Sequence, residues 1–148
     1  MLDANLCFCD GTLDWTYANV VTSNYGTPTS TTKNAMGMGV LDLGSGSAGR
    51  KGGAVVLILT EAAAAVDDAL TVIVEESDTE AFTTPHELGK IDILAATKGV
   101  IIGSETPTTV VFSCIPTRRY LRIDASCVAD DDFKTVYAYW APHPYKDL

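Results

Sequence analysis

The chain has 148 residues, a net charge of −9 at pH 7, 47% hydrophobic residues and 20% charged residues. This length fits one domain, and the composition is that of a globular protein rather than a disordered one. The acidic balance argues against nucleic-acid binding, which requires clustered lysines and arginines. The first ten residues lack the basic start of a secretory signal, and the longest apolar stretch, residues 54–59, is too short to span a bilayer. We therefore expect synthesis in the cytoplasm and no membrane partner.

Residues 1–34 are rich in turn formers, with Asp10-Gly11 and the stretch 23–32 as the clearest examples. A short strand is predicted near residues 17–22. The aromatic residues Trp15 and Tyr17 would leave too much apolar surface in water for a freely moving arm. We therefore predict an extended N-terminal arm over residues 1–34 that docks on a partner, and a single β domain over residues 35–148.

The remaining chain carries period-two alternation, which is typical of strands that bury one face. Strands are predicted at Val40–Leu43, Ala54–Leu59, Leu70–Glu75, Val110–Ile115, Tyr120–Ala125 and Thr135–Trp140. The alternation places seven apolar residues in the core: Leu70, Val72, Val74, Leu121, Ile123, Val136 and Ala138. Short strands separated by turns, without a convincing helix, predict an all-β antiparallel sandwich or jelly-roll-like barrel. Strand spacing alone leaves a jelly roll and an immunoglobulin-like sandwich equally open.

The predicted strand 54–59 is apolar at every position, so both of its faces should be buried. One face of an antiparallel sheet usually meets water. We therefore expect a loop or another subunit to cover this strand. The neighbouring residues Val56 and Leu57 represent its two opposite faces.

Four cysteines, Cys7, Cys9, Cys114 and Cys127, raise the question of a metal site. Buried apolar thiols are the favoured interpretation of Cys114 and Cys127. A four-thiolate zinc site stays open as the less favoured alternative, because the Cys7-x-Cys9 spacing is tighter than that of zinc knuckles.

Motifs that would indicate catalysis are missing from the sequence. The glycine-rich tract 44–53 lacks the order of a phosphate-binding loop. His86 and His143 lie in proline-flanked loops without a ligand or triad pattern. The acids 130–132 lack the spacing of a calcium loop, and those at 75–80 have no opposing carboxylate. We therefore predict no enzyme activity and no cofactor. Outward-facing aromatic residues keep a carbohydrate-binding module open as an alternative function.

One resemblance goes further than the patterns. The element Asp42-Leu43-Gly44, the stretch from Leu70 through Glu75-Glu76-Ser77-Asp78 to Phe82, the strand ending at Ile115-Pro116 and the run Arg119-Tyr120-Leu121-Arg122 are similar to segments of the capsid cement (decoration) proteins of tailed bacteriophages. The resemblance covers about residues 40–140. The longer aromatic N-terminal region and the four cysteines depart from that family.

The resemblance implies a jelly-roll-like domain that forms homotrimers on the outer capsid surface, binds the major capsid protein and stabilises the virion. Under this interpretation the candidate interface residues are Cys7, Cys9, Trp15, Tyr17, Val56, Leu57, Arg119 and Arg122. The arm is expected to dock through its apolar residues. Cys7 or Cys9 then either forms an inter-subunit bridge after release from the reducing cytoplasm or remains a thiol.

Overall fold

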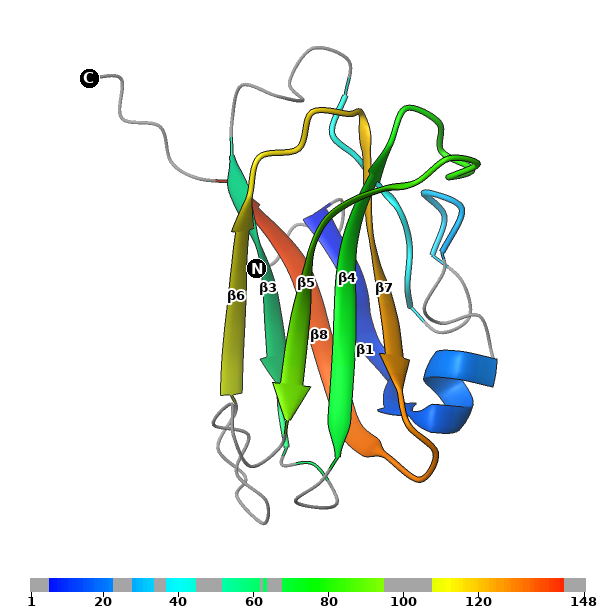
Figure 1. Ribbon diagram of the computed structural model, residues 1–148, viewed down its shortest axis with the longest axis vertical. Helices are drawn as coiled ribbons and strands as arrows, with labels where there is room; N and C mark the ends of the chain where they lie inside the picture. Colours follow the sequence, from blue (N-terminus) through cyan, green and yellow to red (C-terminus); the bar gives the residue numbers. More distant parts are fainter. Residues whose placement is uncertain are drawn as a thin grey trace, which may run out of the picture.

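A computed structural model describes residues 6–22, 28–33, 37–44, 52–61, 63, 68–94 and 108–142. These ranges form eight strands and one short π-helix (Figure 1). The elements in chain order are β1 (Cys7–Thr16), η2 (Ala18–Thr22), β2 (Leu41–Asp42), β3 (Gly53–Leu59), β4 (Ala69–Ser77), β5 (His86–Leu94), β6 (Thr108–Cys114), β7 (Tyr120–Cys127) and β8 (Asp132–Pro142). Within these ranges no helix has the length and apolarity needed to cross a lipid bilayer.

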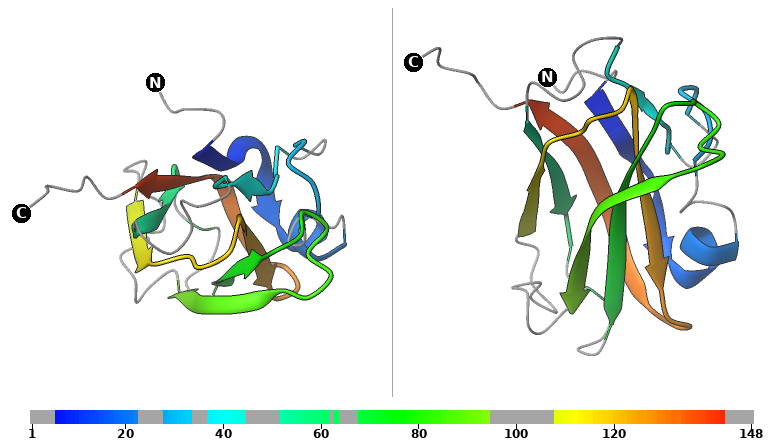
Figure 2. Two further views of the ribbon diagram at one scale, coloured as in Figure 1. Left: turned by 90° about the horizontal axis from the view of Figure 1, so that it is seen from above. Right: turned by 45° about the horizontal axis from the view of Figure 1, so that its top comes forward.

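The strands form two antiparallel four-stranded sheets that pack face to face (Figures 1 and 2). One sheet has the order β1-β8-β3-β6, and the other has the order β2-β7-β4-β5. Strands adjacent in sequence thus usually lie in different sheets, which is the strand order of a jelly roll. The predicted all-β antiparallel sandwich is confirmed, and the connectivity selects the jelly roll over the immunoglobulin-like arrangement.

The core lies between the sheets and is formed by inward-facing residues of both. All seven residues predicted to be core are buried, and Phe8, Trp15 and Phe133 are fully enclosed beside them. Gly53 shows how tightly this interior is filled. A Cβ at that position would lie 2.2 Å from Cζ2 of Trp140, so only glycine leaves space for the indole ring.

Each of the six predicted strands is present, and most extend beyond the predicted bounds by one to three residues. The structure adds two strands, β1 and β5. Of these residues, only Ile91–Ile93 in β5 alternate clearly in the sequence. The prediction of a strand near residues 17–22 is wrong, because Ala18–Thr22 forms the π-helix η2. The apolar run 100–103, most of the glycine-rich tract and most of residues 61–69 lie outside the described ranges.

The predicted N-terminal arm requires correction over Cys7–Thr16. This segment is β1, an integral strand of the first sheet that pairs with β8 from Cys7↔Tyr139 to Thr16↔Asp132. Asp10-Gly11 does mark an irregularity, since the register shifts between Asp10 and Asp14, but the strand continues through it. The predicted boundary between residues 34 and 35 therefore does not separate an arm from the β domain.

The predicted double burial of β3 is confirmed within a single chain. Leu57 faces the core and is fully buried, whereas Val56 faces outward and is only 7% exposed. Val56 lies between its cross-strand neighbours Val111 and Tyr139 in the adjacent strands. The apolar composition of β3 therefore does not by itself require a partner subunit.

Candidate functional site

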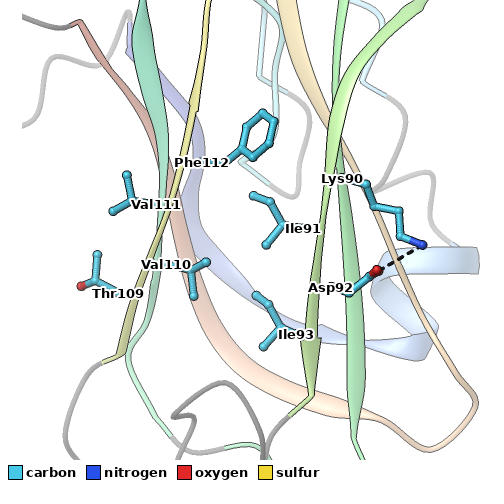
Figure 3. Close-up of a pocket in the computed structure, with 8 residues that line it drawn as sticks. All are labelled: Lys90, Ile91, Asp92, Ile93, Thr109, Val110, Val111 and Phe112. Carbon is cyan, nitrogen blue, oxygen red and sulfur yellow. Dashed lines mark ion pairs between the residues drawn. The ribbon is translucent and has the colours of Figure 1, made fainter.

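A groove lies at the open side of the sandwich, where the edge strands of the two sheets face each other. β5 is an edge of the second sheet and β6 is an edge of the first. The groove between them encloses about 400 Å³, and its walls are formed by Lys90, Ile91, Asp92, Ile93, Thr109, Val110, Val111 and Phe112 (Figure 3).

Strand alternation determines which of these side chains enter the groove. Ile91 and Ile93 of β5 point toward Val110 and Phe112 of β6 (Figure 3). Both isoleucines are buried, and the two β6 residues are half-buried. Val111 points away from the gap and is 57% exposed. The four side chains that enter the groove are thus apolar, and β6 presents an additional apolar residue on the outer face of its sheet.

Gly89 leaves space for Phe112, one of the residues that line this groove. A Cβ at Gly89 would lie 2.4 Å from Cζ of Phe112, so the missing side chain leaves space for the phenyl ring. The register of β5 against β4 shifts next to this position, between Val74 and Glu75. The glycine and the irregularity together let β6 approach β5 through an aromatic ring without hydrogen bonding between the strands.

The polar groups at the groove engage each other instead of pointing into it. Nζ of Lys90 lies 3.2 Å from Oδ1 of Asp92, and the hydroxyl of Thr71 donates a hydrogen bond of 2.9 Å to the same carboxylate. Both charged side chains point away from the gap (Figure 3). Because the side chains that enter the groove are apolar and the charged ones point away, its geometry suits strand or side-chain contact better than acid–base chemistry.

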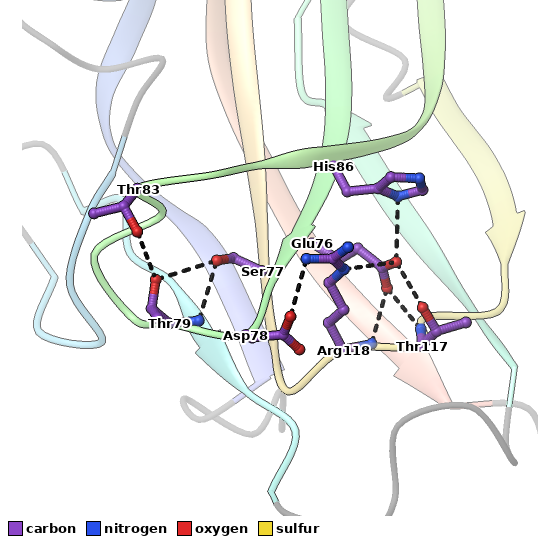
Figure 4. A network of polar contacts seen from close by, with 8 residues as sticks. All are labelled: Glu76, Ser77, Asp78, Thr79, Thr83, His86, Thr117 and Arg118. Atoms are coloured by element: carbon purple, nitrogen blue, oxygen red, sulfur yellow. Dashed lines mark hydrogen bonds and ion pairs between the residues drawn. The ribbon is translucent and has the colours of Figure 1, made fainter.

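A buried carboxylate fixes the loop that follows β6. Glu76, at the end of β4, is 1% exposed and accepts hydrogen bonds from the backbone N–H of Thr117 (2.6 Å), the hydroxyl of Thr117 (2.8 Å) and the backbone N–H of Arg118 (3.0 Å). Figure 4 shows these donors converging on it from the β6–β7 connection. Nδ1 of His86 lies 3.3 Å away at the exposed rim, and Arg118 pairs with Asp78 at 3.0 Å. Glu76 therefore has structural partners on both oxygens and acts as an anchor.

Three residues predicted to contact a partner belong to the core instead. Cys9, Trp15 and Leu57 are fully buried. The indole N–H of Trp15 donates to Sγ of Cys9 at 3.4 Å, and that thiol donates to the carbonyl of Val136 at 3.3 Å. The bond from Cys9 to Val136 links β1 to β8. Because all three side chains are enclosed in the core, they are not available to a partner in the folded chain.

None of the four cysteines forms a disulfide, and each is buried or half-buried. All four cysteines are free, and Sγ of Cys7 donates to the carbonyl of Cys9 at 3.1 Å. Burial raises the pKa of Cys7 and Cys9, and it raises that of Cys114 and Cys127 to about 11. The described residues contain no group of three or more His, Cys, Asp or Glu side chains placed to hold a metal ion. The four thiols are therefore not gathered into the zinc site that the sequence left open.

Of the two arginines predicted at an interface, only one is exposed. Arg119 forms a bidentate pair with Asp42 through bonds of 2.8 and 2.6 Å, and these hydrogen bonds lower the pKa of Asp42. Arg122 is 6% exposed and lies 2.7 Å from Glu75. Its guanidinium also covers the ring of Phe82 at 4.4 Å, which makes it part of the structure beneath the surface.

Two further predicted interface residues lie at the surface to different degrees. Tyr17 is half-buried next to η2, and Val56 is nearly enclosed. Neither belongs to the groove between β5 and β6. Sequence reasoning identified β6 but not β5, and it missed the site because the proximity of these two edge strands depends on the topology. The available signal was the uncharged composition of Thr108–Cys114.

Comparison with known proteins does not assign this chain to a family. No protein-family model matches the sequence, and no curated protein matches it significantly.

Proposed function

We propose that the chain is a non-catalytic structural protein of a virion, a cement protein that binds the major capsid protein on the outside of a tailed-phage head. Its role is to stabilise the head by adding contacts between capsid subunits. The sequence resemblance over about residues 40–140 supports this proposal, as does the jelly-roll strand order. The acidic balance suits an outer position, away from packaged nucleic acid.

The observation that carries the proposal is where the exposed apolar residues lie. Three of the large hydrophobic residues with substantial exposure, Leu94 (45%), Val111 (57%) and Ile115 (61%), are in β5, in β6 or directly after β6. Leu94 and Val111 alternate with the residues that enter the groove, so they lie on the outer faces of their two sheets, on either side of it. A protein that works by burying area on a partner needs apolar surface of this kind and no polar reaction centre.

Homotrimer formation belongs to the proposal through the resemblance alone. β3 does not supply the trimer contact, because Val56 and Leu57 are already buried within one chain. Sedimentation equilibrium of the purified chain tests this part. A trimer mass supports it, and a monomer at micromolar concentration contradicts it.

Head attachment is the direct test of the proposed function. Purified chain is mixed with expanded, undecorated heads of the phage that encodes it, and bound chain is measured after sedimentation. We expect saturable binding and a higher temperature of head disruption. An unrelated acidic jelly-roll protein of similar size serves as the control for non-specific adsorption. Failure to co-sediment at any concentration tested would remove the capsid role.

Carbohydrate binding remains the second candidate because Tyr137 and Tyr139 share the outer face of β8 and are half-buried. Trp15 no longer supports it, since that ring is in the core. Tyr137 packs against the sheet: a Cβ on Gly11 would lie 2.7 Å from its ring. Saturable binding on a glycan array, lost on Tyr139→Ala, would favour this function over the capsid role.

A further inference from the structure

The four edge strands of the two sheets differ in how they are protected against pairing with another chain. Unpaired strand edges attract foreign strands, and proteins block them with charges, bulges, prolines or very short strands. β1 has three register irregularities and carries Asp10 and Asp14. β2 is two residues long. β5 has a register shift and carries Glu87, Lys90 and Asp92.

β6 has none of these protections. Thr108–Cys114 contains no charged residue, proline or glycine, and it pairs with Gly53–Leu59 of β3 in an unbroken register of seven positions. In the described part of the chain, no strand pairs with its other edge. An uncharged strand of high β-propensity with such an edge is a ready template for strand addition.

We propose that the edge of β6 away from β3, along Thr109–Cys114, accepts an extended segment of a partner protein as a fifth strand of the β1-β8-β3-β6 sheet. The segment lies over the groove toward β5. Side chains on its inner face contact Ile91, Ile93 and Phe112, while those on its outer face lie beside Val111. Backbone hydrogen bonds to β6 supply the affinity, and the groove selects apolar residues at alternate positions.

Charge identifies the kind of segment that fits. The whole chain carries −9, yet β6 is uncharged, and the charged residues that line the groove, Lys90 and Asp92, pair with each other. The complementary partner segment is therefore uncharged and apolar, in contrast to the basic partner that an acidic surface would attract.

Area favours a segment over a second copy of the chain. Six residues of strand span about 20 Å, which limits the area that pairing along them can bury. Stable interfaces between folded proteins bury about 1,200–2,000 Å². A flexible segment can add contact area by following the groove, which a rigid second copy cannot enter in the same way. The identification of the segment as part of the major capsid protein rests on the proposed function, whereas the strand-addition site does not.

The test uses a synthetic probe and the intact chain. The probe is a fluorescent nonapeptide of alternating valine and threonine with solubilising lysines outside the strand, and the control peptide has a central proline. Binding is followed by fluorescence anisotropy, and hydrogen exchange of the chain is measured with and without probe. We expect saturable binding, at least tenfold weaker binding of the proline peptide, and slowed exchange of amides within Thr109–Cys114.

Two substitutions separate the site from general effects of charge. Val111→Lys places a charge beside the edge and should weaken probe binding at least tenfold. Ser126→Lys introduces the same charge at an exposed position on β7, a central strand of the other sheet, and should change binding less than twofold. Absence of probe binding, binding without amide protection in β6, or equal effects of the two variants would overturn the proposal.

The two proposals can fail separately. Probe binding without attachment to heads would leave the strand site standing and remove the capsid role. Normal attachment of the Val111→Lys variant to heads, together with no probe binding by the wild-type chain, would leave the capsid role standing and remove the strand site.

Discussion

Removal of the Glu76 carboxylate should destabilise the fold strongly, although Glu76 touches neither the groove nor a partner. The change is Glu76→Ala. It deprives the backbone N–H groups of Thr117 and Arg118, at 2.6 and 3.0 Å, of their acceptor, together with the Thr117 hydroxyl at 2.8 Å. The loop after β6 then loses its anchor to β4.

The magnitude follows from the number and burial of these bonds. A hydrogen bond to a charged group contributes about 1.5–3 kcal/mol when it is shielded from water. Glu76 is 1% exposed, but Thr117 is exposed and Arg118 is partly so, which lets the freed donors recover bonds to water. We therefore expect a loss of about 2–4 kcal/mol in the free energy of unfolding rather than the full sum.

Urea unfolding, followed by the fluorescence of the buried Trp15 and Trp140, measures this loss. Asp78→Ala is the matched control, because Asp78 pairs with Arg118 in the same cluster but its side chain is 73% exposed. That variant should lose less than about 1 kcal/mol. A Glu76→Ala variant no less stable than Asp78→Ala would refute the anchoring role.

Three other substitutions or reactions test separate parts of the fold. Gly53→Ala should cost about 2–4 kcal/mol of unfolding free energy in the same urea assay, because the new Cβ meets the ring of Trp140 at 2.2 Å; an unchanged midpoint would contradict this. Desolvation and the nearby Glu75 raise the pKa of Asp124 to about 6, although Arg122 acts in the opposite direction. Ionisation of Asp124 therefore lowers the stability of the folded state as the pH rises towards that value. Asp124→Asn should raise the melting temperature by about 2–5 °C at pH 7.5 and by less at pH 4, whereas an equal shift at both would contradict the assignment. Alkylation of Cys114 and Cys127 by iodoacetamide at pH 7.5 should be about 100-fold slower in the folded chain than in urea, since a pKa near 11 leaves little thiolate; equal rates would show that the thiols are open.

The sequence predicted those parts of the fold that depend on alternation. In β4 and β7 each inward residue is followed by an outward one, and the predicted core positions Leu70, Val72 and Ile123 are buried. Alternation is a local property, so it can be read without knowledge of which strands are neighbours. Strand order is not local, and two sandwich topologies stayed open until the pairing of β8 with β1 and β3 was known.

β1 was missed because its local signals point away from a strand. Gly11 adopts a φ of +73°, and the register is interrupted at three places, so the alternation in Cys7–Thr16 is broken. Tertiary contacts override this: Phe8 and Cys9 are fully buried against the rest of the core. Deletion of residues 1–12, which a docked arm would tolerate, therefore removes a strand and should unfold the domain.

The candidate interface residues failed for a related reason. Aromatic residues and cysteines near a terminus suggest an arm only when the segment lacks a place in the core. Trp15 and Cys9 have such a place: both are fully buried, and they are joined by a hydrogen bond. The groove, in contrast, depends on two strands that are distant in sequence. Composition alone pointed to β6, but not to the fact that β6 is an edge.

The value of Val111→Lys as a probe depends on its being neutral for folding. Val111 is 57% exposed on the outer face of β6, so a lysine there can extend into water and should change the free energy of unfolding by less than about 0.5 kcal/mol. Val110→Lys, one residue earlier, points into the groove toward Ile91 and should cost several times more (Figure 3). Urea unfolding of both variants checks this difference before any binding is measured. If Val111→Lys destabilises the chain as much as Val110→Lys, the outer face of β6 is already covered within the folded chain, and a loss of probe binding by this variant would not support the strand site.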